Sequence, residues 1–265
     1  MRIWFTFLFS FYVVIAFSQV KICSWNIENF GSSKSDSAIQ FMAEVLKDFD
    51  VVALQEVVVN GSGARAVAQL ADNLNRKGAK WDYVVSEATQ GSAYKSERYA
   101  FLWKPSKVTK LGEPWLDQNF VEEIQREPFF CTFQFGEKEF TLVNFHAKTK
   151  RQQPETEIKY FKFFPDLYPN LNLIFLGDFN CPQKHTVFNP LKKMGYESAF
   201  RNQKTSLRQK CIDDDCLASE YDNVFYNKNR FSLIGSGVVL FYKQFLFFSK
   251  SREISDHIPV WVQII

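Results

Sequence analysis

The chain reads LIFLGDFN at residues 173–180, where four apolar residues run directly into a glycine and an acid and an amide follow two positions apart. An unbroken apolar run that ends at glycine predicts a strand buried on both faces. Beyond Gly177 we expect the chain to leave the sheet. Because side chains alternate along extended backbone, Asp178 and Asn180 should point the same way. Such a pair suits a metal ion or a phosphate, and the alternative is an ordinary Asp/Asn turn.

Polar residues recur where other predicted strands end. These strand-end residues are Asn26, Glu56, His146, Asp178, Asn180, Asp256 and His257. Loops at one end of a rigid sheet framework are where functional sites are usually built. Several carboxylates in one place favour a hard divalent cation, and we expect Mg²⁺, with Mn²⁺ and Ca²⁺ as alternatives.

The chain has only three histidines, and two of them, His146 and His257, lie at these strand ends. Two imidazoles, each held by an acid, can act as general base and general acid near neutral pH. Glu97 and Asp222 flank predicted strands and are the candidate orienting acids, although both could be ordinary surface charges. The third histidine, His185, has no motif around it, and we expect it at the surface.

Composition sets bounds on the fold and on the partners. The 265 residues are 46% hydrophobic and include 29 phenylalanines, so a large core can be buried. No repeat or linker divides the chain, which predicts a single domain over residues 19–265. Hairpins and buried strands with a few interposed helices favour an α+β class with two packed sheets and outer helices. The net charge is only +3, so a polyanion must be held by a local patch or through metal ions.

The first 18 residues have the features of a secretory signal peptide. They combine an early arginine, a long apolar run and small residues, Ala16 and Ser18, at the −3 and −1 positions of a cleavage site. The alternative, an uncleaved membrane anchor, is disfavoured because the apolar run is short for a span. We expect a mature protein that begins near Gln19 and is secreted or periplasmic.

The five cysteines allow a disulfide in an exported chain. Cys23 and Cys131 lie in predicted core strands, so we expect buried thiols there. A disulfide can form among Cys181, Cys211 and Cys216, and the sequence leaves the pairing open. No CxxC pair or nearby histidine accompanies these residues, which argues against zinc.

Five stretches resemble, in order, the motifs of the endonuclease/exonuclease/phosphatase superfamily. They are Trp25-Asn26-Ile27, Leu54-Gln55-Glu56-Val57, Asn144-Phe145-His146, Gly177-Asp178-Phe179-Asn180 and Ser255-Asp256-His257-Ile258-Pro259-Val260. Three further stretches are similar to the deoxyribonuclease I group: Glu97 to Leu102, Arg126 to Phe129, and Tyr221-Asp222 before a strand. The resemblance implies a four-layer α/β/β/α sandwich of two mixed β-sheets with outer helices.

The resemblance also implies ligands for the metal and the phosphate. Glu56 would bind the divalent metal, assisted by Asn26 and Asp256. Asp178 and Asn180 would bind a metal or position the scissile phosphate.

The remaining implied roles concern acid–base catalysis. His257, oriented by Asp222, would be the base, and His146, oriented by Glu97, would be the acid; the opposite assignment stays open. Arg126 would hold a phosphate oxygen while water attacks the phosphorus in line.

The sequence departs from the deoxyribonuclease I group at the expected DNA contacts. Val58 stands where the group usually has an arginine that enters the minor groove, and Asn223 replaces another usual arginine. Lys148, Lys150 and Arg151 follow His146 and could contact phosphates without sequence preference, or form a solvated basic loop.

The sequence therefore predicts a secreted, divalent-metal-dependent endonuclease that cleaves DNA, expected to be double-stranded, with low sequence specificity. We expect a monomer without stable membrane association after signal cleavage. One alternative is a phosphodiesterase or phosphatase of the same fold that acts on sphingomyelin or inositol phosphate headgroups. A non-catalytic binding protein is the other, and it is disfavoured because no catalytic residue of the motifs is lost. The sequence does not determine activity on RNA, product ends, preferred metal or oligomeric state.

Overall fold

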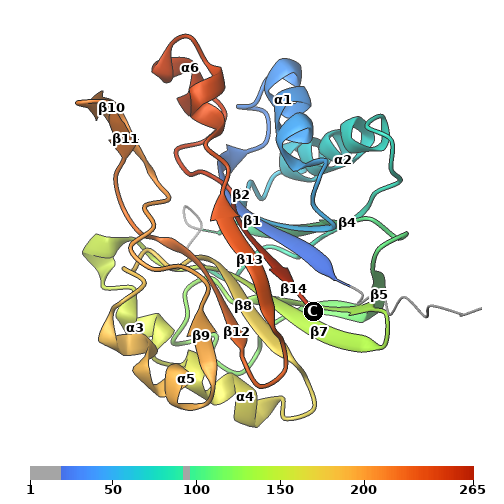
Figure 1. The fold of residues 1–265 in the computed structure, drawn as a ribbon, viewed down its shortest axis with the longest axis vertical. Coiled ribbons are helices and arrows are strands. Elements are labelled where there is room, and N and C mark those ends of the chain that lie inside the picture. The colour runs from blue at the N-terminus through green and yellow to red at the C-terminus, as the bar shows by residue number, and fades with distance from the viewer. Residues whose placement is uncertain (1–18, 92–95) are drawn as a thin grey trace, which may run out of the picture.

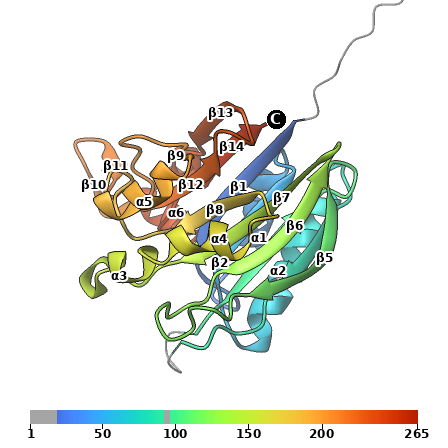
Figure 2. The same cartoon turned by 90° about the horizontal axis from the view of Figure 1, so that it is seen from below.

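A computed structural model describes residues 19–91 and 96–265 of the chain. Within these residues, two six-stranded sheets have the strand orders β13-β14-β1-β2-β4-β3 and β5-β6-β7-β8-β12-β9, and β10 and β11 form a separate hairpin. Figures 1 and 2 show the two sheets face to face, with helices on the outside of each. The predicted signal peptide at residues 1–18 lies outside the described residues. In the part of the chain that is described, no helix combines the length and apolar character needed to cross a membrane.

The strands of the first sheet are β1 (Val20–Phe30), β2 (Val51–Val57), β3 (Asp82–Val85), β4 (Arg98–Trp103), β13 (Leu233–Val238) and β14 (Val260–Ile264). Those of the second are β5 (Thr109–Leu116), β6 (Phe129–Phe135), β7 (Lys138–His146), β8 (Leu173–Asp178), β9 (Tyr196–Ser198) and β12 (Asp222–Asn227). The hairpin comprises β10 (Leu207–Ile212) and β11 (Asp215–Leu217). The α-helices are α1 (Asp36–Leu46), α2 (Gly61–Asn75), α3 (Glu155–Ile158), α4 (Phe164–Leu167), α5 (Asn189–Lys193) and α6 (Phe248–Arg252). Four 3-10 turns complete the described elements: η1 (Lys150–Gln152), η2 (Phe161–Phe163), η3 (Thr186–Phe188) and η4 (Phe241–Gln244).

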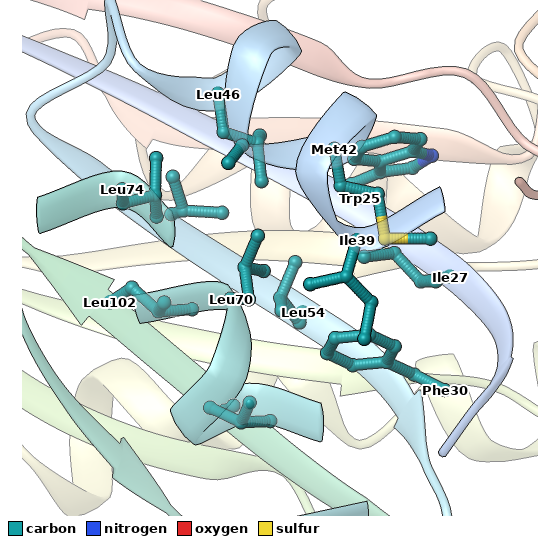
Figure 3. Close-up of a cluster of buried hydrophobic side chains, with 14 of the residues drawn as sticks. Trp25, Ile27, Phe30, Ile39, Met42, Leu46, Leu54, Leu70, Leu74 and Leu102 are labelled. Atoms are coloured by element: carbon teal, nitrogen blue, oxygen red, sulfur yellow. The ribbon is translucent and has the colours of Figure 1, made fainter. Parts of the chain in front are cut away.

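Three layers of buried side chains hold the sandwich together. One lies between the first sheet and helices α1 and α2, and Figure 3 shows part of it, including Trp25, Leu54 and Leu70. The second fills the space between the two sheets, and the third lies between the second sheet and helices α3 to α5. Strand β2 contributes side chains to two layers, because side chains alternate along a strand. Val52 and Leu54 face the helices, while Val51 and Ala53 face the other sheet. The α+β sandwich with outer helices is thus confirmed.

Each sheet contains one parallel pair at its centre. β1 pairs in parallel with β2, and β7 pairs in parallel with β8. The carboxyl ends of parallel strands meet at one edge of a sheet, so each pair delivers two strand-end residues together. In the second sheet His146 and Asp178 are register partners.

The strand formed by the apolar run at residues 173–176 extends one residue further than expected. β8 runs from Leu173 to Asp178, so the chain does not leave the sheet after Gly177, and that expectation was wrong. Gly177 pairs with Phe145 of β7 and with Asn223 of β12. Its φ is +134°, and a Cβ there would lie 1.9 Å from the carbonyl oxygen of Phe145. Glycine is therefore required by the close approach of β7 and by the backbone conformation.

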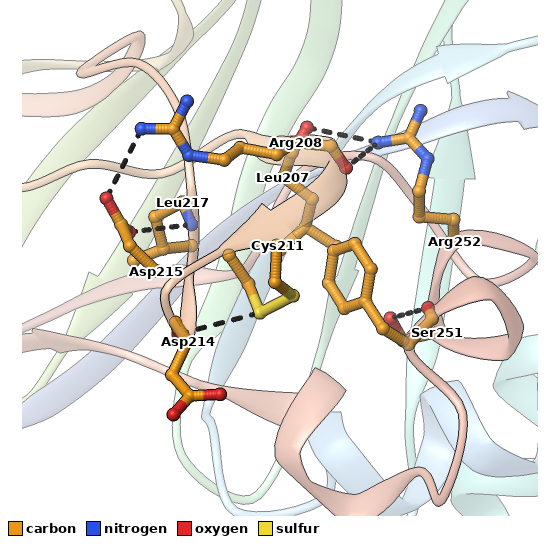
Figure 4. The surroundings of a disulfide bond; sticks show 10 residues. Leu207, Arg208, Cys211, Asp214, Asp215, Leu217, Ser251 and Arg252 are labelled. Atoms are coloured by element: carbon orange, nitrogen blue, oxygen red, sulfur yellow. Dashed lines mark hydrogen bonds and ion pairs between the residues drawn. A yellow bond between two sulfur atoms is a disulfide. The ribbon is translucent and has the colours of Figure 1, made fainter.

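The cysteines resolve the pairing that the sequence left open. Cys211 and Cys216 form a disulfide across the β10–β11 hairpin, with a Cα–Cα distance of 4.1 Å (Figure 4). Cys181 is a buried free thiol, so it does not fasten the segment after Asn180 to this loop. Cys23 and Cys131 are buried free thiols, as expected.

Reducing this disulfide is expected to lower stability modestly. The ring is small, so loop-closure entropy corresponds to about 2 kcal/mol. Dithiothreitol should therefore lower the melting temperature of the wild-type protein by several degrees, about 2–4 °C per kcal/mol. The double variant C211S/C216S should melt near the reduced wild type and should not respond to dithiothreitol. A reductant-sensitive double variant would show that a different disulfide forms among Cys23, Cys131 and Cys181.

Candidate active site

The strand-end residues predicted from the sequence meet in one cavity of about 440 Å³. It opens between the two sheets, where β1, β2, β7 and β8 end. Its lining residues include Glu56, Glu97, Arg126, His146, Asp178, Asn180, Asp256 and His257. Asn26 and Asp222 stand directly behind them, because Asn26 is hydrogen-bonded to Asp178 and Asp222 to His257. All ten predicted site residues are thus brought together, although their separate roles stay predictions.

His257 is held between two carboxylates. Its Nδ1 lies 2.7 Å from Oδ2 of Asp222, and its Nε2 lies 3.6 Å from Oδ2 of Asp178. Asp222 is fully buried, and its backbone N–H donates to Oγ1 of Thr205 at 2.9 Å. Burial alone would lower the pKa of His257, but the charges of Asp222 and Asp178 outweigh it and hold the pKa well above its usual value. The predicted orienting role of Asp222 therefore has the required contact.

His146, the last residue of β7 in the second sheet, is also held between two carboxylates. Its Nδ1 lies 2.9 Å from Oε2 of Glu97, and its Nε2 lies 3.5 Å from Oδ2 of Asp178. The backbone N–H of His146 donates to the hydroxyl of Tyr99 at 3.2 Å. Burial and the nearby Arg126 act to lower the pKa of His146, but Glu97 raises it above the usual value. Both imidazoles thus direct Nε2 at one oxygen of Asp178, while Nδ1 is fixed by a separate acid.

The segment Asp178–Asn180 is bent, so alternation along an extended strand does not explain how its two polar side chains meet. Asn180 has a φ of +48°, in the left-handed region, so the pair does not share a face of an extended strand. Instead, the backbone N–H of Asn180 donates to Oδ1 of Asp178 at 2.9 Å, as in an Asx turn. The Nδ2 of Asn180 donates to the carbonyl oxygen of Ala147 at 3.1 Å. The two side chains meet as predicted, but a turn brings them together.

Asn26, Glu56 and Asp178 form a set of oxygen ligands. The Nδ2 of Asn26 donates to Oε1 of Glu56 at 3.0 Å and to Oδ2 of Asp178 at 3.1 Å. The Oδ1 of Asn26 is buried without a hydrogen-bond partner among the described residues, and a half-turn of the amide exchanges the two atoms. Glu56 adopts a φ of +61°, where the pairing of β2 with β4 is irregular, and such bulges often re-aim a side chain.

Negative charge accumulates on this side of the cavity. Asp256 lines the cavity with Glu56. Burial, then the charge of Asp256, raises the pKa of the neighbouring Glu28, and Glu56 adds to the rise. Carboxylates and an unpaired amide oxygen are the donor set that hard divalent cations prefer, so these residues fit such an ion.

A second group with metal-binding side chains has a different explanation. Single ligand atoms of Asp178, Asp222 and His257 lie within 4.8 Å of one another. However, Asp222 holds the Nδ1 of His257 at 2.7 Å, and this contact is explained by orientation of the imidazole without a metal. Asp178 belongs both to this group and to the oxygen ligands around Glu56.

Arg126 makes three hydrogen bonds within the protein in addition to facing the cavity. Its Nη1 donates to Glu97 at 3.1 Å, its Nε donates to the carbonyl oxygen of His146 at 2.9 Å, and its Nη2 donates to that of Ala147. A guanidinium has five N–H donors, so two remain for a phosphate oxygen. Arg126 thus fixes the acid that orients His146 and still lines the cavity.

Two buried residues contribute to the site and were missed as site residues in the sequence. Ser255 donates from Oγ to the carbonyl oxygen of Asn26 at 2.7 Å and accepts from the N–H of His257 at 3.0 Å. Glu157 accepts from the N–H groups of Gln125 and Lys148, both at 2.8 Å. Glu157 thereby joins the loop before Arg126 to the loop after His146. The only signal for Glu157 in the sequence is its place in the acidic first turn of a helix. Acidic residues there are usually explained by the helix dipole.

His185 lies outside the cavity. It is half-buried, and its Nδ1 accepts from the N–H of Val187 at the start of η3. We expected His185 at the surface, and it is half-buried instead. Because it lies outside the cavity, it serves as a histidine control.

This combination of two oriented imidazoles, a bridging carboxylate and a set of oxygen ligands defines a phosphoesterase-type centre between two β-sheets. The model of the endonuclease/exonuclease/phosphatase family matches residues 23–257. The chain belongs to this family and, within it, to the deoxyribonuclease I-like branch, and it is a hydrolytic phosphodiesterase.

Named relatives agree with this assignment. A deoxyribonuclease of Thioalkalivibrio sp. (strain K90mix) is 26% identical over 267 residues, which cover 93% of this chain and 71% of that protein. Human deoxyribonuclease-1 is 30% identical over 180 residues, 62% of this chain and 61% of that protein. The match thus spans less than two thirds of the human enzyme.

Solved structures show the same fold. An endonuclease/exonuclease/phosphatase family protein from Bacteroides thetaiotaomicron superposes with a TM-score of 0.67 at 17% identity, over 93% of this chain and 97% of that chain. Humanized TDP2 of D. rerio superposes with a TM-score of 0.66 at 16% identity, over 94% and 99%. At these identities the similarity bears on the fold alone.

Proposed function

We propose that this protein is a divalent-metal-dependent endonuclease that hydrolyses phosphodiester bonds in DNA with low sequence specificity. One observation carries the proposal: the Nε2 atoms of His146 and His257 lie 3.5 and 3.6 Å from the same oxygen of Asp178. Two proton-transfer groups therefore face one small volume from opposite sheets. The deoxyribonuclease relatives favour DNA over sphingomyelin or inositol phosphate headgroups.

The roles of the residues follow from this arrangement. His257, with Nδ1 fixed by Asp222, accepts a proton from the attacking water through Nε2 in its neutral form, which the raised pKa favours only at higher pH. His146, with Nδ1 fixed by Glu97, donates a proton to the leaving oxygen. The reverse order fits the same geometry. Both imidazoles are pre-oriented by buried acids, so little reorganisation is needed during the reaction.

The phosphate is positioned by neutral and cationic donors. Asn180 presents an amide whose orientation is fixed by Ala147 and Asp178, and Arg126 has N–H groups left to donate. Glu56, Asn26, Asp256 and Asp178 would hold Mg²⁺, or Mn²⁺ or Ca²⁺ in its place. When bound, the ion would supply Lewis-acid stabilisation of the charge that develops on the phosphate oxygens.

We also propose that the protein is exported and acts as a monomer on double-stranded DNA outside the cytoplasm. The apolar segment at residues 1–18 supports export, and the Cys211–Cys216 disulfide suits an oxidising compartment. The intact mass of exported protein tests this, because a chain that begins near Gln19 is expected and a full-length chain would refute processing.

The first experiment is a plasmid-nicking assay with pure protein. We expect supercoiled DNA to be nicked with Mg²⁺ or Mn²⁺ and to remain intact with a chelator. Sphingomyelin and inositol phosphates should be turned over poorly under the same conditions. If none of these metals supports DNA cleavage while a headgroup substrate is hydrolysed, the DNA assignment is wrong.

Glu56→Gln tests the proposed cation ligand with a side chain of the same shape. A saturating ion, at about 100 times its dissociation constant, stabilises the folded wild-type protein by about 2.7 kcal/mol. Mg²⁺ should thus raise the melting temperature of the wild type and leave that of Glu56→Gln nearly unchanged, with loss of nicking. An equal Mg²⁺-induced shift in both proteins would exclude Glu56 as a ligand.

A further inference from the structure

A second cavity lies beside the active site and is used by none of the steps above. Its volume is about 460 Å³, within the range of ligand sites. It is lined by Gln183, Lys184, Lys192, Tyr196, Glu197, Ser198, Phe200, Arg201 and Asn202. These residues come from α5, from β9 and from the segments next to them, at the edge of the second sheet (Figure 1).

Three cations surround this cavity without partners. In residues 19–91 and 96–265, the side chains of Lys184, Lys192 and Arg201 make no ion pair and no hydrogen bond. The acid in the lining, Glu197, is neutralised from outside, because its Oε1 lies 2.8 Å from Nζ of Lys228. The cavity therefore carries an uncompensated positive charge although the whole chain is close to neutral.

Two aromatic residues in the lining belong to the core. Tyr196 and Phe200 are buried, with 4% and 5% of their surfaces exposed, and each packs into a core layer next to the second sheet. The groups that this cavity offers to a ligand are therefore its polar and cationic side chains, and cations of this kind contact the phosphates of nucleic acid without reading its bases.

Gln183 joins the lining of this cavity to a residue of the catalytic centre by a hydrogen bond. This side chain is almost fully buried, and its Nε2 donates to the carbonyl oxygens of Gln203 at 2.9 Å and Asp222 at 3.4 Å. Gln183 stands three residues after Asn180, and Asp222 orients His257. A strand whose scissile phosphate lies at the two imidazoles can thus continue past Asn180 toward β9.

We propose that this cavity, the β9 cleft, is an exosite for the phosphodiester backbone of the DNA strand that flanks the cleaved bond. The inference rests on the proposed function. Lys192 and Arg201 each contact a flanking phosphate, and the contact is independent of base sequence. The β9 cleft thereby binds DNA through local positive charge, which the small net charge of the whole chain does not supply.

The test is the double charge reversal K192E/R201E, assayed on long DNA and on bis(p-nitrophenyl) phosphate. The small probe has no flanking phosphates, so the exosite cannot act on it. For plasmid DNA we expect the KM to rise at least about tenfold. The slope of log KM against log salt should fall by about 1 to 2, roughly one unit per lost phosphate contact. The rate on the small probe should stay unchanged.

The control is K107E/K138E, which changes the charge equally at the opposite end of the strands. Lys107 follows β4 at the end remote from Glu97, and Lys138 begins β7, which ends at His146. This variant should behave like the wild type. Equal effects of the two double variants on long DNA, or no effect of either, would overturn the exosite. A wild-type protein that hydrolyses the small probe but no DNA would refute the proposed function and the exosite together.

Discussion

His257→Ala is expected to lower the turnover number for DNA cleavage by about 10²–10⁴-fold, the usual contribution of a positioned general acid or base. The imidazole is held at 2.7 Å by Asp222 and faces Asp178, and alanine removes one of the two imidazoles that are proposed to exchange protons with water and with the leaving oxygen. KM should change little, because the proposed phosphate contacts of Asn180 and Arg126 do not involve His257. Initial rates of plasmid nicking with Mg²⁺ measure the effect.

Two variants make this result specific. His185→Ala removes a histidine outside the cavity and should keep the wild-type rate, although it loses a cap at η3. Asp222→Asn keeps the shape of the orienting residue but removes its charge, so a smaller loss with an altered pH profile is expected. A His257→Ala enzyme that retains more than a tenth of the wild-type rate would contradict the role of His257.

Gly177→Ala is expected to destabilise the fold by at least about 4 kcal/mol, which is large for one methyl group. The added Cβ would lie 1.9 Å from the carbonyl oxygen of Phe145, and the φ of +134° is unfavourable for any L side chain. The strain cannot be relieved by a rotamer change, because the obstacle is backbone in a buried strand pair. Urea denaturation followed by circular dichroism measures the free energy of unfolding.

The matched control is Gly61→Ala at the start of α2. A Cβ at Gly61 meets no atom within 4 Å and its φ is not in the left-handed region. This substitution should be neutral or slightly stabilising, by up to about 1 kcal/mol. A soluble Gly177→Ala protein with wild-type stability would show that β7 and β8 can separate, and the stated reason for this glycine would then be wrong.

The sequence predicted the residues of the site better than their connections. Asn26, Glu56, His146 and Asp178 could be found because each follows an apolar run in the sequence, and the carboxyl ends of parallel strands meet at a common edge. The structure includes all four residues in their strands. The structure places each histidine beside the acid predicted to orient it, at 2.9 Å for Glu97 with His146 and at 2.7 Å for Asp222 with His257. Those pairings came from the resemblance to a family, since strand periodicity does not show which loops meet.

The features that sequence reasoning did not predict depend on tertiary contacts. Asn180 was expected on extended backbone, but a left-handed turn closed by Asp178 replaces the alternation. Gly177 was taken as the end of a strand, although its function is close contact with the backbone of Phe145. Glu157 could not be recognised, because its partners are backbone N–H groups in two distant loops. The pairing of Cys211 with Cys216 required the hairpin geometry.

We propose that His146 and His257 form one catalytic centre, in which each imidazole is fixed by its own acid. The most direct measurement is the rate at which the double variant H146A/H257A nicks supercoiled plasmid in the presence of Mg²⁺. The rate is compared with that of the wild type, and a melting temperature equal to that of the wild type shows that the variant is folded. The arrangement predicts a rate at least about 10³-fold below the wild type. A correctly folded double variant that nicks DNA within tenfold of the wild-type rate would contradict it.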